Sequence, residues 1–368
     1  KIKFNLRNDE KGNFVVYGKH KISLEDYISD KNILDNIHGE SIWSINFIIP
    51  GLNSKKSLIR VEAISDMNGI KISYPKPFYK NISESSNAEI NFDIKNFMLL
   101  NIKVSYNGIY SEFSSLDSLN GYIDFSGKKN IIPNNKINLI GTINEINLDE
   151  WKKITKEDSQ VDYLSYINKL DLKFNKFITD KLIIDKLSIK GYTSLNQFNF
   201  NSISASNKFL KLNATGTVEY DNISSFKFKV ESENLEDLLN YWSFNHGIRD
   251  AYIDSNFDIS WKGTLFDFGL KNIYGKLTTT LKNGRLKKVG NRATRIFGLF
   301  NIDLLAKRLS LDFDDVTKNG FYFSSFNGDF RVQDGNIFTT NLLIKGPSAE
   351  LLTVGTTNFI EETYDMQV

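Results

Sequence analysis

Bulky apolar and polar side chains alternate along much of this 368-residue chain, and that period of two constrains the fold more than any other feature. The alternation is clear in the segments Ile90–Ile94, Ile102–Tyr106, Phe226–Val230 and Phe257–Trp261. Successive side chains of a β-strand point to opposite faces of the sheet. Each segment therefore predicts a strand with one large apolar face, often aromatic, and one face of Lys, Asn, Asp or Ser.

Turn signals separate these segments. Asn-Gly and Asp-Gly pairs tolerate the positive φ angles of tight hairpin turns, so a series of them predicts strands joined into an antiparallel meander. The Asn-Gly pairs stand at residues 68–69, 107–108, 120–121, 283–284, 319–320 and 327–328, and the Asp-Gly pair at 334–335.

Helical segments are few. A weak pattern covers residues 24–37, and a second, with a polar break, covers 148–170. Residues 234–242 predict a helix capped by Asn234, with acidic residues in its first turn. We expect one continuous elongated domain, made of a groove segment at 1–147, a helix-containing connection at 148–170, a groove segment at 171–290, an apolar helix at 291–309 and C-terminal groove strands at 310–368.

Composition narrows the function classes. The formal net charge of +2 is too balanced to indicate nucleic-acid binding. Cysteine is absent, which excludes disulfides and thiolate metal sites. No apolar run approaches the roughly 18 residues that a membrane-spanning helix needs. Since the chain begins with Lys1 and shows no signal-peptide features, we expect a fragment whose anchor and targeting signal lie outside it.

A long β-meander can close into a barrel, stack as two sheets, or bend into an open trough. Few helices are available here to cover the apolar faces, so we expect a mainly β fold, an elongated antiparallel sheet curled into an open hydrophobic groove. The side chains expected to line it are Ile90, Phe92, Ile94, Ile102, Val104, Leu172, Phe174, Phe226, Phe228, Val230, Phe257, Ile259, Trp261, Phe321, Phe323, Phe330 and Val332.

The segment 292–309 is apolar around more than one stripe, which predicts a helix that is buried on two sides or touches lipid. As a plug or gate it would use Ile296, Phe297, Leu299, Phe300, Leu304 and Leu305. Four of the chain's eight arginines fall in this region. Arg forks bind phosphate or carboxylate alike, so they would contact a lipid headgroup or pair with the acidic run at 312–315. These arginines are Arg285, Arg292, Arg295 and Arg308.

No catalytic motif is present, and we predict neither an enzyme nor a cofactor or metal site. The three histidines, His20, His38 and His246, have no partner at metal-ligand spacing and indicate loop or surface positions. The acidic run at 312–315 lacks the calcium-loop spacing and is typical of the solvated face of a strand.

Several pieces of the chain together resemble the C-terminal region of the YhdP family, AsmA-like proteins of Gram-negative bacteria. The most specific are NGRL at 283–286, RLSLDF at 308–313, NGFYFSSFNGDF at 319–330, KGPSAE at 345–350 and TYDMQV at 363–368. Looser similarity lies in residues 39–51 and 69–80. The resemblance extends over essentially the whole chain and is strongest after about residue 250.

The resemblance implies a periplasmic β-groove that carries phospholipid between the inner and outer membranes, as part of an inner-membrane-anchored protein. It implies that acyl chains slide in the groove with headgroups in solvent, and that membranes are contacted through regions outside this segment. It supplies no catalytic residue. The alternative is a periplasmic scaffold or chaperone that assists outer-membrane protein assembly by adding strands to exposed sheet edges.

Overall fold

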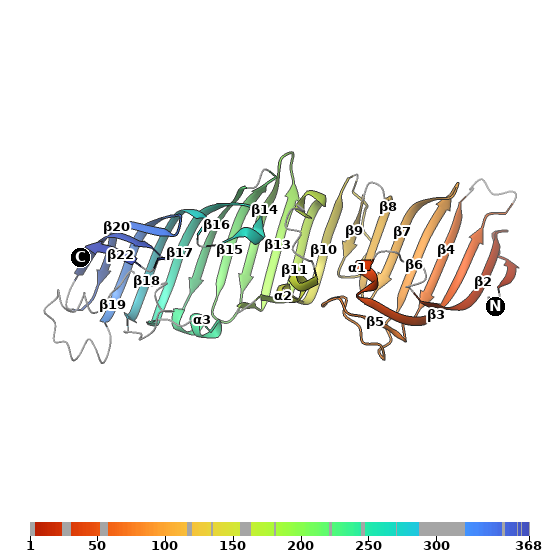
Figure 1. The fold of residues 1–368 in the computed structure, drawn as a ribbon, viewed down its shortest axis with the longest axis horizontal. Helices are drawn as coiled ribbons and strands as arrows, with labels where there is room; N and C mark the ends of the chain where they lie inside the picture. Colours follow the sequence, from red (N-terminus) through yellow and green to blue (C-terminus); the bar gives the residue numbers. More distant parts are fainter. Residues whose placement is uncertain are drawn as a thin grey trace. The chain divides into compact units, whose positions relative to one another are not determined.

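The computed structural model is mainly β and divides into two compact units, residues 1–179 and 180–368. It describes residues 4–23, 31–51, 58–115, 120–133, 135–154, 163–179, 182–220, 223–243, 247–269, 271–286, 321–347, 350–358, 360–361 and 363–367. Figure 1 shows the strands of each unit lying side by side. The mainly β prediction is confirmed. The division falls at 179/180, inside the segment that the sequence assigned to 171–290.

Unit 1 is one sheet whose strands follow chain order, except that the short strand β5 pairs with the start of β3 and leaves β4 to pair with β6. A small core of Trp43, Met67, Ile70, Ile72 and Ala88 fills this junction. The strands are β1 (Asn5–Asn8), β2 (Phe14–Ser23), β3 (Ile37–Ile49), β4 (Ile59–Ser65), β5 (Ile70–Ile72), β6 (Ala88–Lys95), β7 (Met98–Tyr106), β8 (Ile109–Ser115), β9 (Asn120–Asp124), β10 (Ile137–Asn147) and β11 (Ile167–Thr179).

The antiparallel order breaks at one place in unit 1, where β10 pairs parallel to both β9 and β11. Parallel neighbours need a connection that runs back along the sheet, which a two-residue turn cannot supply. Residues 125–133 belong to the first return, and helix α2 (Leu148–Ile154) with the 3₁₀ turn Tyr163–Tyr166 belongs to the second. Helix α1 (Lys31–Leu34) lies in the region of the weak helical pattern.

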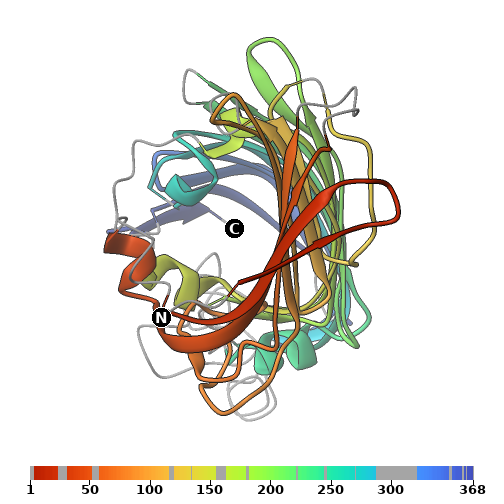
Figure 2. The same cartoon turned by 90° about the vertical axis from the view of Figure 1, so that its right-hand side faces the viewer.

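Unit 2 is a meander without such a break: from β13 to β22 each strand pairs antiparallel with the next. Figure 2 shows that its strands, green to blue, follow a curved rather than a flat path. They are β12 (Leu182–Ile184), β13 (Lys186–Thr193), β14 (Gln197–Ser206), β15 (Lys211–Glu219), β16 (Ile223–Ser232), β17 (Ile248–Lys262), β18 (Ile273–Leu286), β19 (Phe321–Gln333), β20 (Asn336–Lys345), β21 (Glu350–Asn358) and β22 (Thr363–Gln367).

Helix α3 (Leu235–Tyr241) runs along one margin of this sheet and buries Leu235 and Leu238. Asn234 caps it, because its side-chain oxygen accepts the Asp237 N–H at 3.1 Å. The predicted cap and acidic first turn are therefore confirmed. A second short element, the 3₁₀ turn Leu265–Asp267, follows β17.

The hairpin predictions are partly wrong. Asn107-Gly108 and Asp334-Gly335 form tight turns with positive φ at both residues, as expected. The pairs at 120–121, 283–284 and 327–328 lie inside strands instead. There the glycine serves packing: a Cβ on Gly284 would stand 2.5 Å from the ring of Phe323. The pair at 319–320 is outside the described residues.

Candidate functional site

A continuous apolar row crosses the sheet of unit 2. Phe228 on β16 lies opposite Ala214 and Phe257, and the row continues through Leu277 to Phe330 on β19. Residues directly opposite one another in a sheet share a face, so these side chains all project to the same side. The rings of Phe228 and Phe257 stack at a centroid distance of 4.4 Å. The apolar residues that alternate along each strand therefore form one connected surface across the strands.

On the same face, the side chains around Phe226, next to the row of Phe228, are covered by aromatic packing. Phe226 stacks on Trp261 with ring centroids 5.4 Å apart and contacts Phe200 at 5.6 Å. Gly216, opposite Phe226, leaves the room that this ring needs, since a Cβ there would stand 2.3 Å from it. These side chains therefore form a packed core that stabilises the sheet, next to the more open row of Phe228.

By the strand registers, fifteen of the seventeen predicted groove residues lie on the apolar face of their own unit. The other two, Phe321 and Phe323, are an odd number of positions from Phe330 on β19 and are buried, and the ring of Phe323 lies 6.1 Å from that of Phe326. Exposure divides the seventeen into two groups. Buried against protein are Leu172, Phe174, Phe226, Ile259, Trp261, Phe321, Phe323, Phe330 and Val332. Only half-buried, and so able to contact a guest, are Ile90, Phe92, Ile94, Ile102, Val104, Phe228, Val230 and Phe257.

Unit 1 has an equivalent half-buried surface. Phe92 on β6 lies between Val61 and Ile102, and Ile90 lies between Ala63 and Val104. The register continues along this face to Ile123 on β9 and Leu139 on β10. None of these rows contains a charged side chain, so an apolar guest would meet a nearly uniform wall.

The opposite face of unit 2 carries ionic rows. Lys227 pairs with Asp258 at 3.2 Å, and Lys229 pairs with both Glu231 at 2.9 Å and Asp254 at 3.1 Å. The hydrogen bonds that the Lys229 ammonium donates to Glu231 and then to Asp254 raise the pKa of Lys229. Charges that pair across strands keep this face solvated and favour one strand register. The other face is therefore the one available for apolar contacts.

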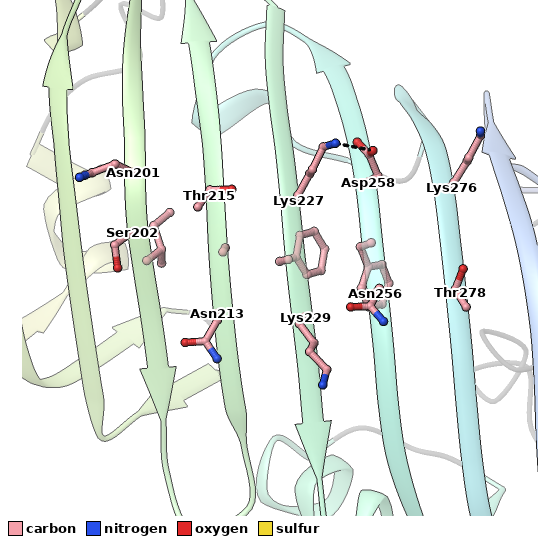
Figure 3. Close-up of a pocket in the computed structure, with 14 residues that line it drawn as sticks. Asn201, Ser202, Asn213, Thr215, Lys227, Lys229, Asn256, Asp258, Lys276 and Thr278 are labelled. Carbon is pink, nitrogen blue, oxygen red and sulfur yellow. Dashed lines mark ion pairs between the residues drawn. The ribbon is translucent and has the colours of Figure 1, made fainter.

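A shallow depression of about 610 Å³ crosses strands β14 to β18 (Figure 3), and both apolar and polar residues of these strands line it. Its border contains two complete polar rows, from Thr215 through Lys227 and Asp258 to Lys276 and from Asn213 through Lys229 and Asn256 to Thr278. The lining thus combines Ala214, Phe228 and Phe257 of the apolar row with amide, hydroxyl and charged groups.

Unit 1 also holds an aromatic contact that the sequence did not predict. The segment between β5 and β6 brings Tyr74 and Phe78 against Trp151 of α2, with ring centroids 6.3 and 5.9 Å apart, and Phe78 against Phe125 at 6.3 Å. The Trp151 indole donates to the Lys76 carbonyl oxygen at 3.0 Å. We call these four rings the aromatic clasp. They are up to 77 residues apart in sequence, so no local pattern identifies them.

The proposed gate helix and most of the predicted headgroup contacts lie outside the described residues. These are Ile296, Phe297, Leu299, Phe300, Leu304, Leu305, Arg292, Arg295 and Arg308. The remaining one, Arg285 on β18, pairs with Asp250 at 3.2 Å. That carboxylate comes from β17 and not from the acidic run at 312–315.

Within the described ranges, no group of three or more His, Asp or Glu side chains is placed to hold a metal ion. His20 and His38 lie on strands β2 and β3, and His38 contacts the Asp35 carbonyl oxygen at 3.2 Å. Of the helices that the structure describes, none has the length and hydropathy needed to span a bilayer.

Comparison with known proteins places residues 156–368 within the model of the family described as "YhdP protein". The chain is also similar to the intermembrane phospholipid transporter YhdP of Escherichia coli K12, with 23% identity over 145 residues. That alignment covers 39% of this chain and 12% of the relative, so the chain matches only a small part of the longer protein. No solved structure matches.

Proposed function

The chain belongs to the YhdP family, and on that premise we propose that it carries phospholipid, with acyl chains on the apolar face of each unit and headgroups in solvent. The observation that carries the proposal is the half-buried apolar row through Phe228 and Phe257, which the protein leaves partly uncovered. The similar Escherichia coli protein is an intermembrane phospholipid transporter, which supports the same class of cargo.

Energetics favour such a face as a transport surface. A phospholipid carries about 30 chain methylenes, and exposing each to water costs roughly 0.8 kcal/mol, on the order of 20 kcal/mol in all. A wall of Phe, Ile, Leu and Val removes much of this cost. Because these rows contain no charged side chain, an acyl chain can slide along them without meeting a deep free-energy minimum.

We place the protein in the periplasm, as part of an inner-membrane-anchored chain that reaches toward the outer membrane. This location rests on the family and on the name of the relative. We propose that regions outside these 368 residues contact the two membranes. The half-buried rows favour this conduit over an assembly scaffold, which would need uncovered strand edges rather than an uncovered apolar face.

Site-specific photo-crosslinking tests the proposal. A photoreactive phenylalanine at position 228 is expected to give phospholipid adducts in cells. The same residue at position 227, one step along β16 and on the ionic face, is the matched control and is expected to give few. Protein adducts at 228 without lipid would favour the scaffold, and equal lipid labelling at both positions would reject the apolar face as the lipid path.

A further inference from the structure

A cluster of three charges lies at the end of the apolar face in unit 1. Lys76, from the segment between β5 and β6, places its Nζ 3.1 Å from Oε1 of Glu145. Lys176 of β11 places its Nζ 3.6 Å from Oε2 of the same carboxylate. We call these three side chains the rim cluster. It unites three stretches of chain that are separated by at least 31 residues.

The rim cluster is on the apolar face and not on the ionic one. In the parallel pairing of β10 with β11, Glu145 lies beside Lys176, and two residues earlier Ile143 lies beside Phe174. The same face of β10 continues back to Leu139, beside Ile123. At 3.3 Å per residue, Leu139 and Glu145 are about 20 Å apart along the strand. The face is thus apolar along its length and charged at its end.

The charge of the cluster is not balanced. Two ammonium groups share one carboxylate, which leaves one positive charge in excess. The side chains of Lys76, Lys176 and Glu145 keep 60%, 46% and 32% of their surface exposed, so an incoming ligand can reach them. Lys76 also belongs to the segment that the aromatic clasp holds in place, because its carbonyl oxygen accepts the Trp151 N–H at 3.0 Å.

We propose that the rim cluster binds the phosphate of a phospholipid whose acyl chains lie on the apolar face of unit 1. The two lysines supply charge-assisted hydrogen bonds to the phosphate oxygens. Glu145 holds the lysines together when no lipid is present and competes with the phosphate when one arrives. This assignment rests on the proposed function and adds to it a residue-level headgroup site.

The test compares two probes with the same acyl chains, dioleoylphosphatidylglycerol and dioleoylglycerol, which lacks the phosphate. Native mass spectrometry of the 368-residue chain with an equimolar mixture gives the ratio of phospholipid-bound to diacylglycerol-bound protein. Lys76→Gln and Lys176→Gln are each expected to lower this ratio about threefold to tenfold, the scale for one charge-assisted contact at a partly exposed site. Lys227→Gln, on the ionic face of unit 2, is the matched control and should leave it unchanged.

Glu145→Gln separates ligand binding from a structural role. If the cluster only anchors the segment between β5 and β6, removing Glu145 or either lysine breaks the same contacts and shifts the ratio in the same direction. If it binds phosphate, Glu145→Gln removes the competitor and raises the ratio. An unchanged ratio in both lysine variants, or a fall in Glu145→Gln, would overturn the site.

Two further outcomes are distinguishable. Inorganic phosphate, added as a separate probe at the lipid concentration, should not displace phosphatidylglycerol; displacement would assign the cluster to free phosphate and reject the lipid site. Failure of the chain to bind either lipid would reject the proposed function itself. An unchanged ratio with both lipids bound would reject only the rim cluster.

Discussion

The two units use the same period-two pattern and cover their apolar faces differently. In unit 2 the strands from β13 onward form a plain antiparallel meander, and much of the apolar face is closed by neighbouring rows such as Phe200, Phe226 and Trp261. In unit 1 the meander breaks at the parallel strand β10, and connecting segments contribute the aromatic clasp at the end of the face.

The difference shows that the alternation specifies faces but not what covers them. In unit 2 the cover comes from within the sheet, where glycine opposite an aromatic ring lets adjacent rows interlock. In unit 1 it comes from loops that the parallel crossovers and the β5–β6 connection bring to the strand ends. The apolar face of a sheet can thus be bounded by aromatic packing within the sheet or by connecting segments.

The largest effect is expected from removing one buried and one half-buried aromatic ring in unit 2 and comparing the losses of stability. Phe226→Ala removes a ring that is 8% exposed and should lower the free energy of unfolding by about 3–5 kcal/mol. Phe228→Ala, two residues away on the same face, removes a half-buried ring and should cost less than half as much, while reducing lipid binding more. Urea unfolding followed by intrinsic fluorescence measures the first effect, and native mass spectrometry measures the second.

Equal stability losses at the two positions would show that the row of Phe228 is packed core as well. That result would remove the distinction between covering and guest-binding rows. Phe257→Ala provides a second test of the open row, since Phe257 stacks directly on Phe228.

The hairpin turns offer a matched pair, one from each unit. Gly108 and Gly335 have φ angles of +74° and +78°, a region that disfavours any residue with a Cβ. Gly108→Ala meets no neighbouring atom and should cost about 1 kcal/mol, whereas Gly335→Ala would also meet Ile360 and should cost about 2 kcal/mol. Thermal unfolding of the two variants checks the order, and a larger loss at Gly108 would contradict it.

Alkaline pH should test the buried tyrosines of β8 and β9 in unit 1. Burial, followed by the charge of Glu112, raises the pKa of Tyr110, and burial is also the main cause that raises the pKa of Tyr122. A group whose pKa is raised on folding adds stability below its unfolded pKa, near 10, and that stability is lost as pH rises through the folded value. Unit 1 should therefore lose hydrogen-exchange protection in β8 and β9 above about pH 10.

Tyr110→Phe should flatten this alkaline loss, since the phenol can no longer ionise. The expected effect is the smallest of the three, because Tyr122 still titrates beside Glu112, with its hydroxyl 3.2 Å from Oε2. An unchanged alkaline profile in the variant would assign the loss to other groups.

Sequence reasoning predicted the strands and their faces well, because alternation is a local property that sheet geometry converts directly into sides. It placed Phe228 and Phe257 on one face without knowledge of their pairing. It misassigned the glycines at 121, 284 and 328, since Asn-Gly has the same local preference in a turn as in a bulge. Whether such a glycine forms a turn or lies inside a strand depends on the aromatic ring that packs over it, and that ring can come from another strand.

By itself, then, the sequence determined the β class, the apolar and ionic faces, the Asn234 cap and the family resemblance, all of which depend on residues close together in the chain. The tertiary structure alone decided the parallel strand β10, the packed and open rows, and the meeting of Lys76, Glu145 and Lys176. The reason is physical: pairing partners and connection paths bring together residues tens of positions apart, and neither periodicity nor composition carries that information.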